Sequence, residues 1–145
     1  MVDHHSALIY TMVLMSASDA NMSDEELDTI GENVRYLPVF KDFDHHRLAE
    51  ITEECLALLT DPNGLETALE MIKLKLPTRL YETAYAVACD IVASDRSASR
   101  EELRLLELLR DKLDLDPLAA AAIERGARAR HITPAHTQTA LYIEG

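Results

Sequence analysis

The amino-acid sequence predicts an all-α domain, a single compact bundle of about seven short helices. Apolar residues recur every three or four positions along most of the 145-residue chain, which is the period of an amphipathic helix. No stretch shows the alternation of apolar and polar residues that is typical of a half-buried strand. Serine, aspartate or proline precedes the periodic stretches, as expected at helix N-termini. We therefore expect one domain over residues 1–145, long enough to bury a hydrophobic core.

The first two helices are predicted from an apolar stripe and a capping box. Apolar residues at i, i+4 and i+7 predict an amphipathic helix over about 4–18. Ser23 and Glu26 have the spacing of a capping box, in which each side chain bonds the backbone amide of the other residue. The second helix should stop before Pro38, because proline disfavours helical backbone in the preceding residue. The expected buried residues are Leu8, Met12, Val13 and Met15 in the first helix, and Leu27, Ile30, Val34 and Leu37 in the second.

The next three helices are predicted from their first residues. Asp44 is a suitable N-cap for a third helix. Asp61 followed by Pro62 indicates the start of a fourth, since proline suits the first helical position, and Pro77 indicates the start of a fifth. The expected buried stripes are Leu48, Ile51, Cys55 and Leu58; Leu65, Leu69 and Ile72; and Leu80, Ala84, Val87 and Ile91.

The last two helices also begin at recognisable caps. Ser99 and Glu102 form a second capping box, followed by a leucine stripe at helical spacing. Asp116 and Pro117 start a seventh helix, and residues 131–145 then form a C-terminal tail without a clear period. The leucine stripe of the sixth helix consists of Leu103, Leu106, Leu109 and Leu113.

Two segments of the chain nearly repeat one another. Residues 17–27 and 93–103 are identical at seven of eleven aligned positions. The repeat extends over units of about 5–37 and 81–113, each consisting of a helix, an acidic turn and a capped helix. We therefore expect an internal two-fold repeat, with the first helix packed near the fifth.

The charge of the chain is concentrated in its first half. Residues 1–72 contain 15 acidic and three basic residues, whereas residues 73–145 contain 11 of each, so the first half carries the whole net charge of −12. A single acidic face would attract cations or a basic protein partner. It would repel a phosphate backbone, so nucleic acid is not expected as a ligand.

The cysteines and the apolar runs bear on the compartment of the protein. Cys55 and Cys89 lie among apolar residues, which predicts buried thiols in a reducing compartment and no disulfide. The chain opens without a basic-then-apolar leader, and no apolar run approaches the roughly 20 residues of a membrane span. We therefore expect a cytoplasmic protein with no direct membrane insertion.

The acidic residues of the repeat allow two interpretations. As caps, they stabilise helix N-termini and need no ligand. As ligands, carboxylates from both turns would converge on a divalent metal ion, which prefers oxygen donors. The first copy is not an EF-hand, since Asp24 and Ile30 stand at the positions that require glycine and glutamate. The candidate metal ligands are Asp19, Glu26, Asp95 and Glu102, with Glu25 and Asp90 as further candidates.

Other potential sites are less specific. Asp90 lies in an apolar run, where a carboxylate is expected to pair with an arginine or to cap a neighbouring helix. His45 and His46 are adjacent and point to different faces of a helix, so they do not form a metal pair. The sequence contains no nucleophile elbow and no phosphate-binding glycine loop, and we expect no enzymatic activity.

The repeated pattern Ala-Ser-Asp…Ser-x-Glu-Glu-Leu, after an apolar helix in an all-helical chain, resembles the TerB family of tellurite-resistance proteins. That family is related to the TerB-type region of certain DnaJ-like co-chaperones. The resemblance covers roughly residues 5–130. The four candidate ligands fall on the family's acidic positions, whereas Ala20 and Arg96 stand where the family has glycine. The resemblance implies a bacterial stress-response protein with a metal-sensing or scaffold role and a membrane-associated protein partner.

Two modes of action remain open for such a non-enzymatic helical module. In the first, the paired acidic turns bind a divalent cation. In the second, the protein is metal-free, the turns are only caps, and an acidic face docks a protein partner. A metallohydrolase is disfavoured because no histidine lies near either turn.

Overall fold

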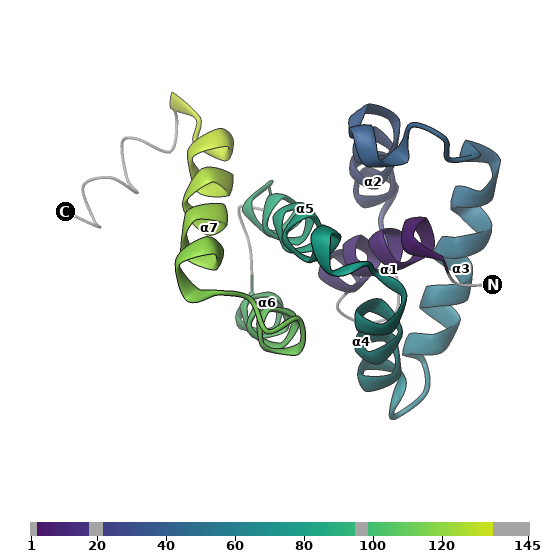
Figure 1. Ribbon diagram of the computed structural model, residues 1–145. Helices are drawn as coiled ribbons and strands as arrows, with labels where there is room; N and C mark the ends of the chain where they lie inside the picture. The colour runs from purple at the N-terminus through teal and green to yellow at the C-terminus, as the bar shows by residue number, and fades with distance from the viewer. Residues whose placement is uncertain (1–2, 18–21, 95–98, 135–145) are drawn as a thin grey trace.

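The computed structural model describes residues 3–17, 22–94 and 99–134, which fold into helices with no strand among them (Figure 1). The predicted all-α class and its seven helices are confirmed. Short 3₁₀ turns, Pro38–Phe40, His45–Arg47 and Thr78–Leu80, lie in the connections. The α-helices are α1 (His4–Ser16), α2 (Asp24–Tyr36), α3 (Leu48–Leu59), α4 (Gly64–Lys75), α5 (Tyr81–Ser94), α6 (Arg100–Lys112) and α7 (Pro117–His131).

The first helix, α1, lies at the centre of the molecule. All of residues 6–15 are buried, so the predicted amphipathic character of this helix is wrong. The reason is that α3, α4 and α5 pack around it and that α2 and α6 contact it as well. A helix that is apolar all round is typical of a domain interior. Its N-terminus is capped by Asp3, whose carboxylate accepts a hydrogen bond from the Ser6 amide at 2.9 Å.

The remaining helices are arranged on different sides of α1. Figure 1 shows α3 and α5 on opposite sides of α1, with α7 at the edge of the bundle beyond α5. The contact between α1 and α5 confirms the expected proximity of the first and fifth helices. The last helix, α7, packs on α5 and buries Ala120 and Ala127.

Three predicted helix caps are confirmed, and three other helices begin later than predicted. Ser23, Ser99 and Asp116 cap α2, α6 and α7 as predicted. Asp44 caps the 3₁₀ turn His45–Arg47 that precedes α3, and the 3₁₀ turn Thr78–Leu80 lies between Pro77 and the start of α5. Pro62 does not begin the fourth helix, because the chain turns here and α4 starts at Gly64. A Cβ atom on Gly64 would lie 2.0 Å from the carbonyl oxygen of Leu58, so the close approach of this turn to α3 requires glycine.

Two leucines of the repeat differ from the prediction. Leu27 and Leu103 occupy equivalent positions and are expected to be buried, yet their exposed fractions are 36% and 52%. The faces of α2 and α6 that pack on the core are narrower than the predicted apolar stripes. Ile30, Val34 and Leu109 are the buried residues of these faces. Each copy of the repeat forms a helix with a buried face followed by a capped helix of 13 residues, and the two-fold relation between the copies stays a prediction.

None of the helices in the described part of the chain combines the length and the apolar character that crossing a bilayer requires.

Candidate functional site

Both capping boxes of the repeat are formed. The amide of Ser23 donates a hydrogen bond to Glu26 Oε1 at 2.8 Å, and the amide of Glu26 donates to Ser23 Oγ at 3.1 Å. The corresponding distances between Ser99 and Glu102 are 3.0 Å and 3.2 Å. Each glutamate therefore satisfies a backbone amide that the first turn of a helix would otherwise leave unpaired.

The structure describes only some of the residues of the predicted metal site. Asp19 and Asp95 lie outside the described residues, and Glu26 and Glu102 are engaged in the capping boxes. Glu25 is exposed on the first turn of α2. Within residues 3–17, 22–94 and 99–134, no three His, Cys, Asp or Glu side chains are grouped so that they could hold a metal ion. Metal binding by the paired turns stays a prediction.

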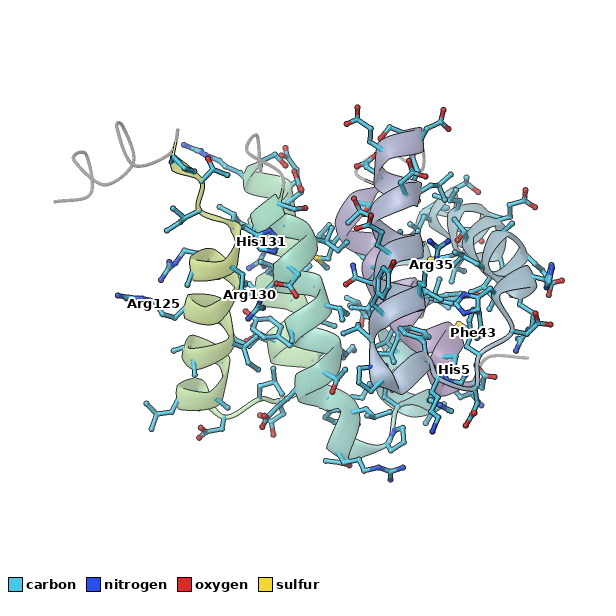
Figure 2. The ribbon with its side chains drawn as sticks, turned by 90° about the horizontal axis from the view of Figure 1, so that it is seen from above. His5, Arg35, Phe43, Arg125, Arg130 and His131 are labelled. Atoms are coloured by element: carbon cyan, nitrogen blue, oxygen red, sulfur yellow. The ribbon has the colours of Figure 1, made fainter. Side chains whose placement is uncertain are left out.

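Asp90 has the arginine partner that the sequence predicts. Its Oδ1 atom accepts a hydrogen bond from Arg130 Nη2 at 2.7 Å and lies 3.3 Å from His131 Nε2. Arg130 and His131 belong to the last turn of α7, and Figure 2 shows them on the side of α7 that faces α5. The carboxylate therefore joins α5 to α7, while the positive charge of Arg130 is favourable at the negative end of the α7 dipole.

A groove between α2 and the beginning of α3 combines apolar and acidic side chains. Its volume is about 510 Å³. Leu27 and Leu48 supply apolar surface, Asp28 and Glu32 supply carboxylates, and Gly31 leaves the wall between them without a side chain. We call this surface the α2–α3 groove. The residues that line it are Leu27, Asp28, Gly31, Glu32, Arg35, His45, Leu48 and Ala49.

The α2–α3 groove lies in the most acidic part of the molecule. Residues 24–54 contain ten acidic and three basic residues. Arg47, one of the three, pairs with Asp3 at 3.6 Å. Asp28 and Glu32 are exposed, and neither forms an ion pair with any residue that the structure describes. Arg35 also lines the groove and offsets one of the two charges, so the groove keeps an excess of negative charge that a bound cationic group would neutralise.

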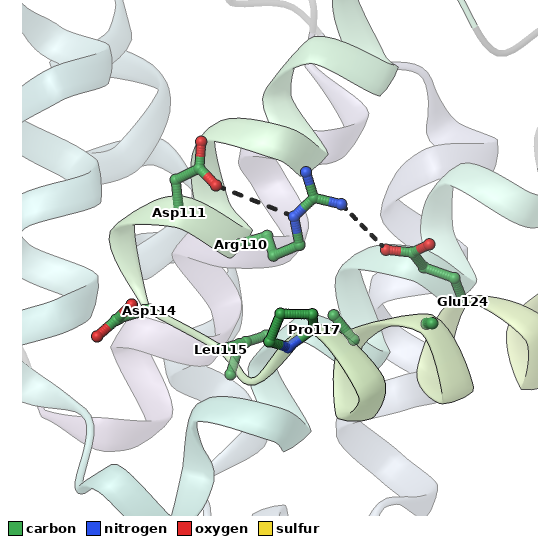
Figure 3. A pocket seen from close by; sticks show the side chains of 8 residues that line it. Arg110, Asp111, Asp114, Leu115, Pro117 and Glu124 are labelled. Carbon is green, nitrogen blue, oxygen red and sulfur yellow. Dashed lines mark ion pairs between the residues drawn. The ribbon is translucent and has the colours of Figure 1, made fainter.

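A second cavity, of about 580 Å³, lies between α6 and α7, and one arginine and three carboxylates line it (Figure 3). The Arg110 guanidinium lies 3.6 Å from Glu124 Oε2 and 4.0 Å from Asp111 Oδ1. Tyr85 donates a hydrogen bond of 2.6 Å to Glu124, and burial together with this bond raises the pKa of the Tyr85 hydroxyl. Because these contacts link side chains of α5, α6 and α7, we interpret the cavity as part of the junction between the three helices.

The α2–α3 groove is not predictable from the sequence alone. A weak signal is present, since Asp28 and Glu32 are spaced i, i+4 on one helix face, with Arg35 as the one basic residue of α2 on that face. The decisive features, the exposure of Leu27 and the approach of Leu48, depend on how α2 and α3 pack.

Comparison of the chain with protein-family models, with curated proteins and with solved structures found no significant match.

Proposed function

We propose that this protein is a non-enzymatic helical module that docks a basic segment of a protein partner in the α2–α3 groove. The observation that supports the proposal is the pair of exposed carboxylates, Asp28 and Glu32, beside the apolar side chains of Leu27 and Leu48. A role in a bacterial stress response beside a membrane-associated partner, which the resemblance to TerB proteins implies, is compatible with such docking.

The groove favours an amphipathic basic segment over a metal ion. A divalent cation requires several oxygens converging on one point. A docked helix instead places apolar side chains on Leu27 and Leu48 while its lysines or arginines approach Asp28 and Glu32. The acidic residues around the groove would accelerate the encounter, and salt would screen this effect because the Debye length is about 10 Å at 0.1 M.

The proposal is tested by titrating the protein with an amphipathic helical peptide of leucine and lysine and following backbone amide signals by NMR. We expect the shift changes to be centred on α2 and the start of α3. Replacing Asp28→Asn and Glu32→Asn should weaken binding roughly tenfold, since two charge interactions at the rim of the groove are lost. Raising the salt concentration should weaken binding by the wild-type protein more than binding by this variant.

The matched control is the double variant Glu101→Gln and Glu107→Gln, which removes two exposed charges from α6. Its net charge changes by the same amount, so it should retain wild-type affinity for the peptide if the groove is the site. Equal weakening in both variants would mean that the peptide responds to net charge alone, and the proposal would be wrong.

A further inference from the structure

The outer face of α7 combines exposed apolar residues with arginine. Leu118 and Ile132, at its two ends, have exposed fractions of 80% and 50%. Arg125 lies between them on the same face of the helix. Residues at the spacing i, i+4, i+7, i+11 and i+14 share one face over about four helical turns. The exposed residues at this spacing are Leu118, Ala122, Arg125, Ala129 and Ile132.

The arginines of this face differ in their contacts from those near the core. Arg130 is paired with Asp90 on the inner side of α7, at 2.7 Å. Arg125 and Arg128 are exposed, and neither forms an ion pair with any residue in the described ranges. Figure 2 shows Arg125 directed away from the bundle, on the opposite side of α7 from Arg130 and His131. The chain therefore carries an amphipathic basic helix of the kind that the α2–α3 groove is proposed to accept.

We propose that the α2–α3 groove binds α7 of a second copy of this chain. The inference rests on the proposed function of the groove and names its occupant. Leu118 would cover Leu27 and Leu48, while Arg125 and Arg128 would approach Asp28 and Glu32. The lengths also agree, because α7 has 15 residues and α2 has 13, or about 22 Å and 20 Å of helix.

The positions of the two surfaces determine the kind of assembly. Figures 1 and 2 show α7 at one end of the molecule and α3 at the other. The groove and the outer face of α7 are different parts of the chain, so a contact between them is heterologous. Each contact therefore joins copies head to tail and leaves a free groove and a free α7 at the ends of the assembly.

Sedimentation velocity of the 145-residue chain tests this inference. At about 0.05 M salt we expect species that grow beyond a dimer as the protein concentration rises, and at about 0.5 M salt we expect mostly monomer. Two variants should each remain monomeric at low salt: Asp28→Asn with Glu32→Asn, which changes the groove, and Arg125→Gln with Arg128→Gln, which changes α7. Lys73→Gln with Lys75→Gln removes two exposed positive charges from α4 and should assemble as the wild type does.

An equimolar mixture of the groove variant and the α7 variant gives the sharpest result. One copy retains an intact α7 and the other an intact groove, so the mixture should form a heterodimer and stop there. A heterodimer also demonstrates that both variants are folded.

Contrary outcomes separate the inference from the proposed function. A wild-type chain that stays monomeric at low salt while its groove still binds the leucine–lysine peptide overturns the inference alone. A wild-type chain that neither self-associates nor binds the peptide overturns both the inference and the proposed function. Assembly that persists in either variant, or a mixture that grows beyond a dimer, shows that the contact lies elsewhere and overturns the inference.

Discussion

Two buried threonines give opposite predictions at the scale of the single residue. The Thr52 hydroxyl on α3 is buried and has no hydrogen-bond partner among the described residues. The Thr11 hydroxyl on α1 is equally buried and donates to the carbonyl of Ala7 at 2.9 Å. Replacing threonine by valine keeps the shape of the side chain and removes the hydroxyl, so the two sites differ mainly in the hydrogen bond.

We predict that Thr52→Val raises the free energy of unfolding by about 1 kcal/mol, because an unsatisfied buried hydroxyl is removed. Thr11→Val should lower it by about 1 kcal/mol, because a formed hydrogen bond is lost. Urea denaturation with equal m-values for the three proteins measures both changes. A loss of stability in Thr52→Val similar to that in Thr11→Val would mean that the Thr52 hydroxyl is satisfied in solution.

At the scale of the element, the sequence predicts what depends on neighbours along the chain. The capping boxes at Ser23 and Ser99 are confirmed because all their hydrogen bonds lie within four consecutive residues. The start of α4 is missed because Gly64 is set by the distance to Leu58 on the preceding helix. The exposure of Leu27 is missed for the same reason, since a hydrophobic stripe does not reveal how wide a face its neighbours cover.

The capping box of α2 also provides a test of metal binding. Ser23→Ala should lower the free energy of unfolding by about 1 kcal/mol, because the amide of Glu26 loses its acceptor. Glu26→Gln should change it little, since glutamine can accept the same hydrogen bond from the Ser23 amide. Thermal unfolding of both variants and of the wild type, with and without calcium, measures these effects. A calcium-dependent stabilisation of the wild type that Glu26→Gln abolishes would contradict a purely capping role and favour the metal hypothesis.

At the scale of the whole molecule, the central position of α1 is the largest departure from the sequence analysis. Its apolar residues were sufficient to predict a helix but not to show that five helices contact it. The α2–α3 groove likewise exists only because two separate elements come together, so the candidate site emerges from tertiary packing. By contrast, the arginine partner of Asp90 is one of the two arrangements that the sequence predicts, because a carboxylate in an apolar run needs a charged or hydrogen-bonding partner.

The two cysteines report on the integrity of this core. Cys55 on α3 and Cys89 on α5 are both buried, and burial raises the pKa of each thiol to about 12. Because only the thiolate reacts, we predict that Ellman's reagent at about pH 8 labels the native protein about a thousand times more slowly than the urea-unfolded chain. The folded state holds these protons more tightly, so stability from this source is present below about pH 9, the ordinary thiol pKa, and is lost as the pH rises above it.

The order in which the thiols react distinguishes unfolding of the whole core from local opening. If α3 and α5 unfold together with α1, Cys55 and Cys89 should become reactive at the same urea concentration, and Cys55→Ser and Cys89→Ser variants allow each thiol to be followed separately. Faster labelling of Cys89 would instead indicate that α7 and α5 open before the rest, because α7 packs on α5 at the edge of the bundle. Rapid labelling of both thiols in the native protein would contradict a core organised around α1.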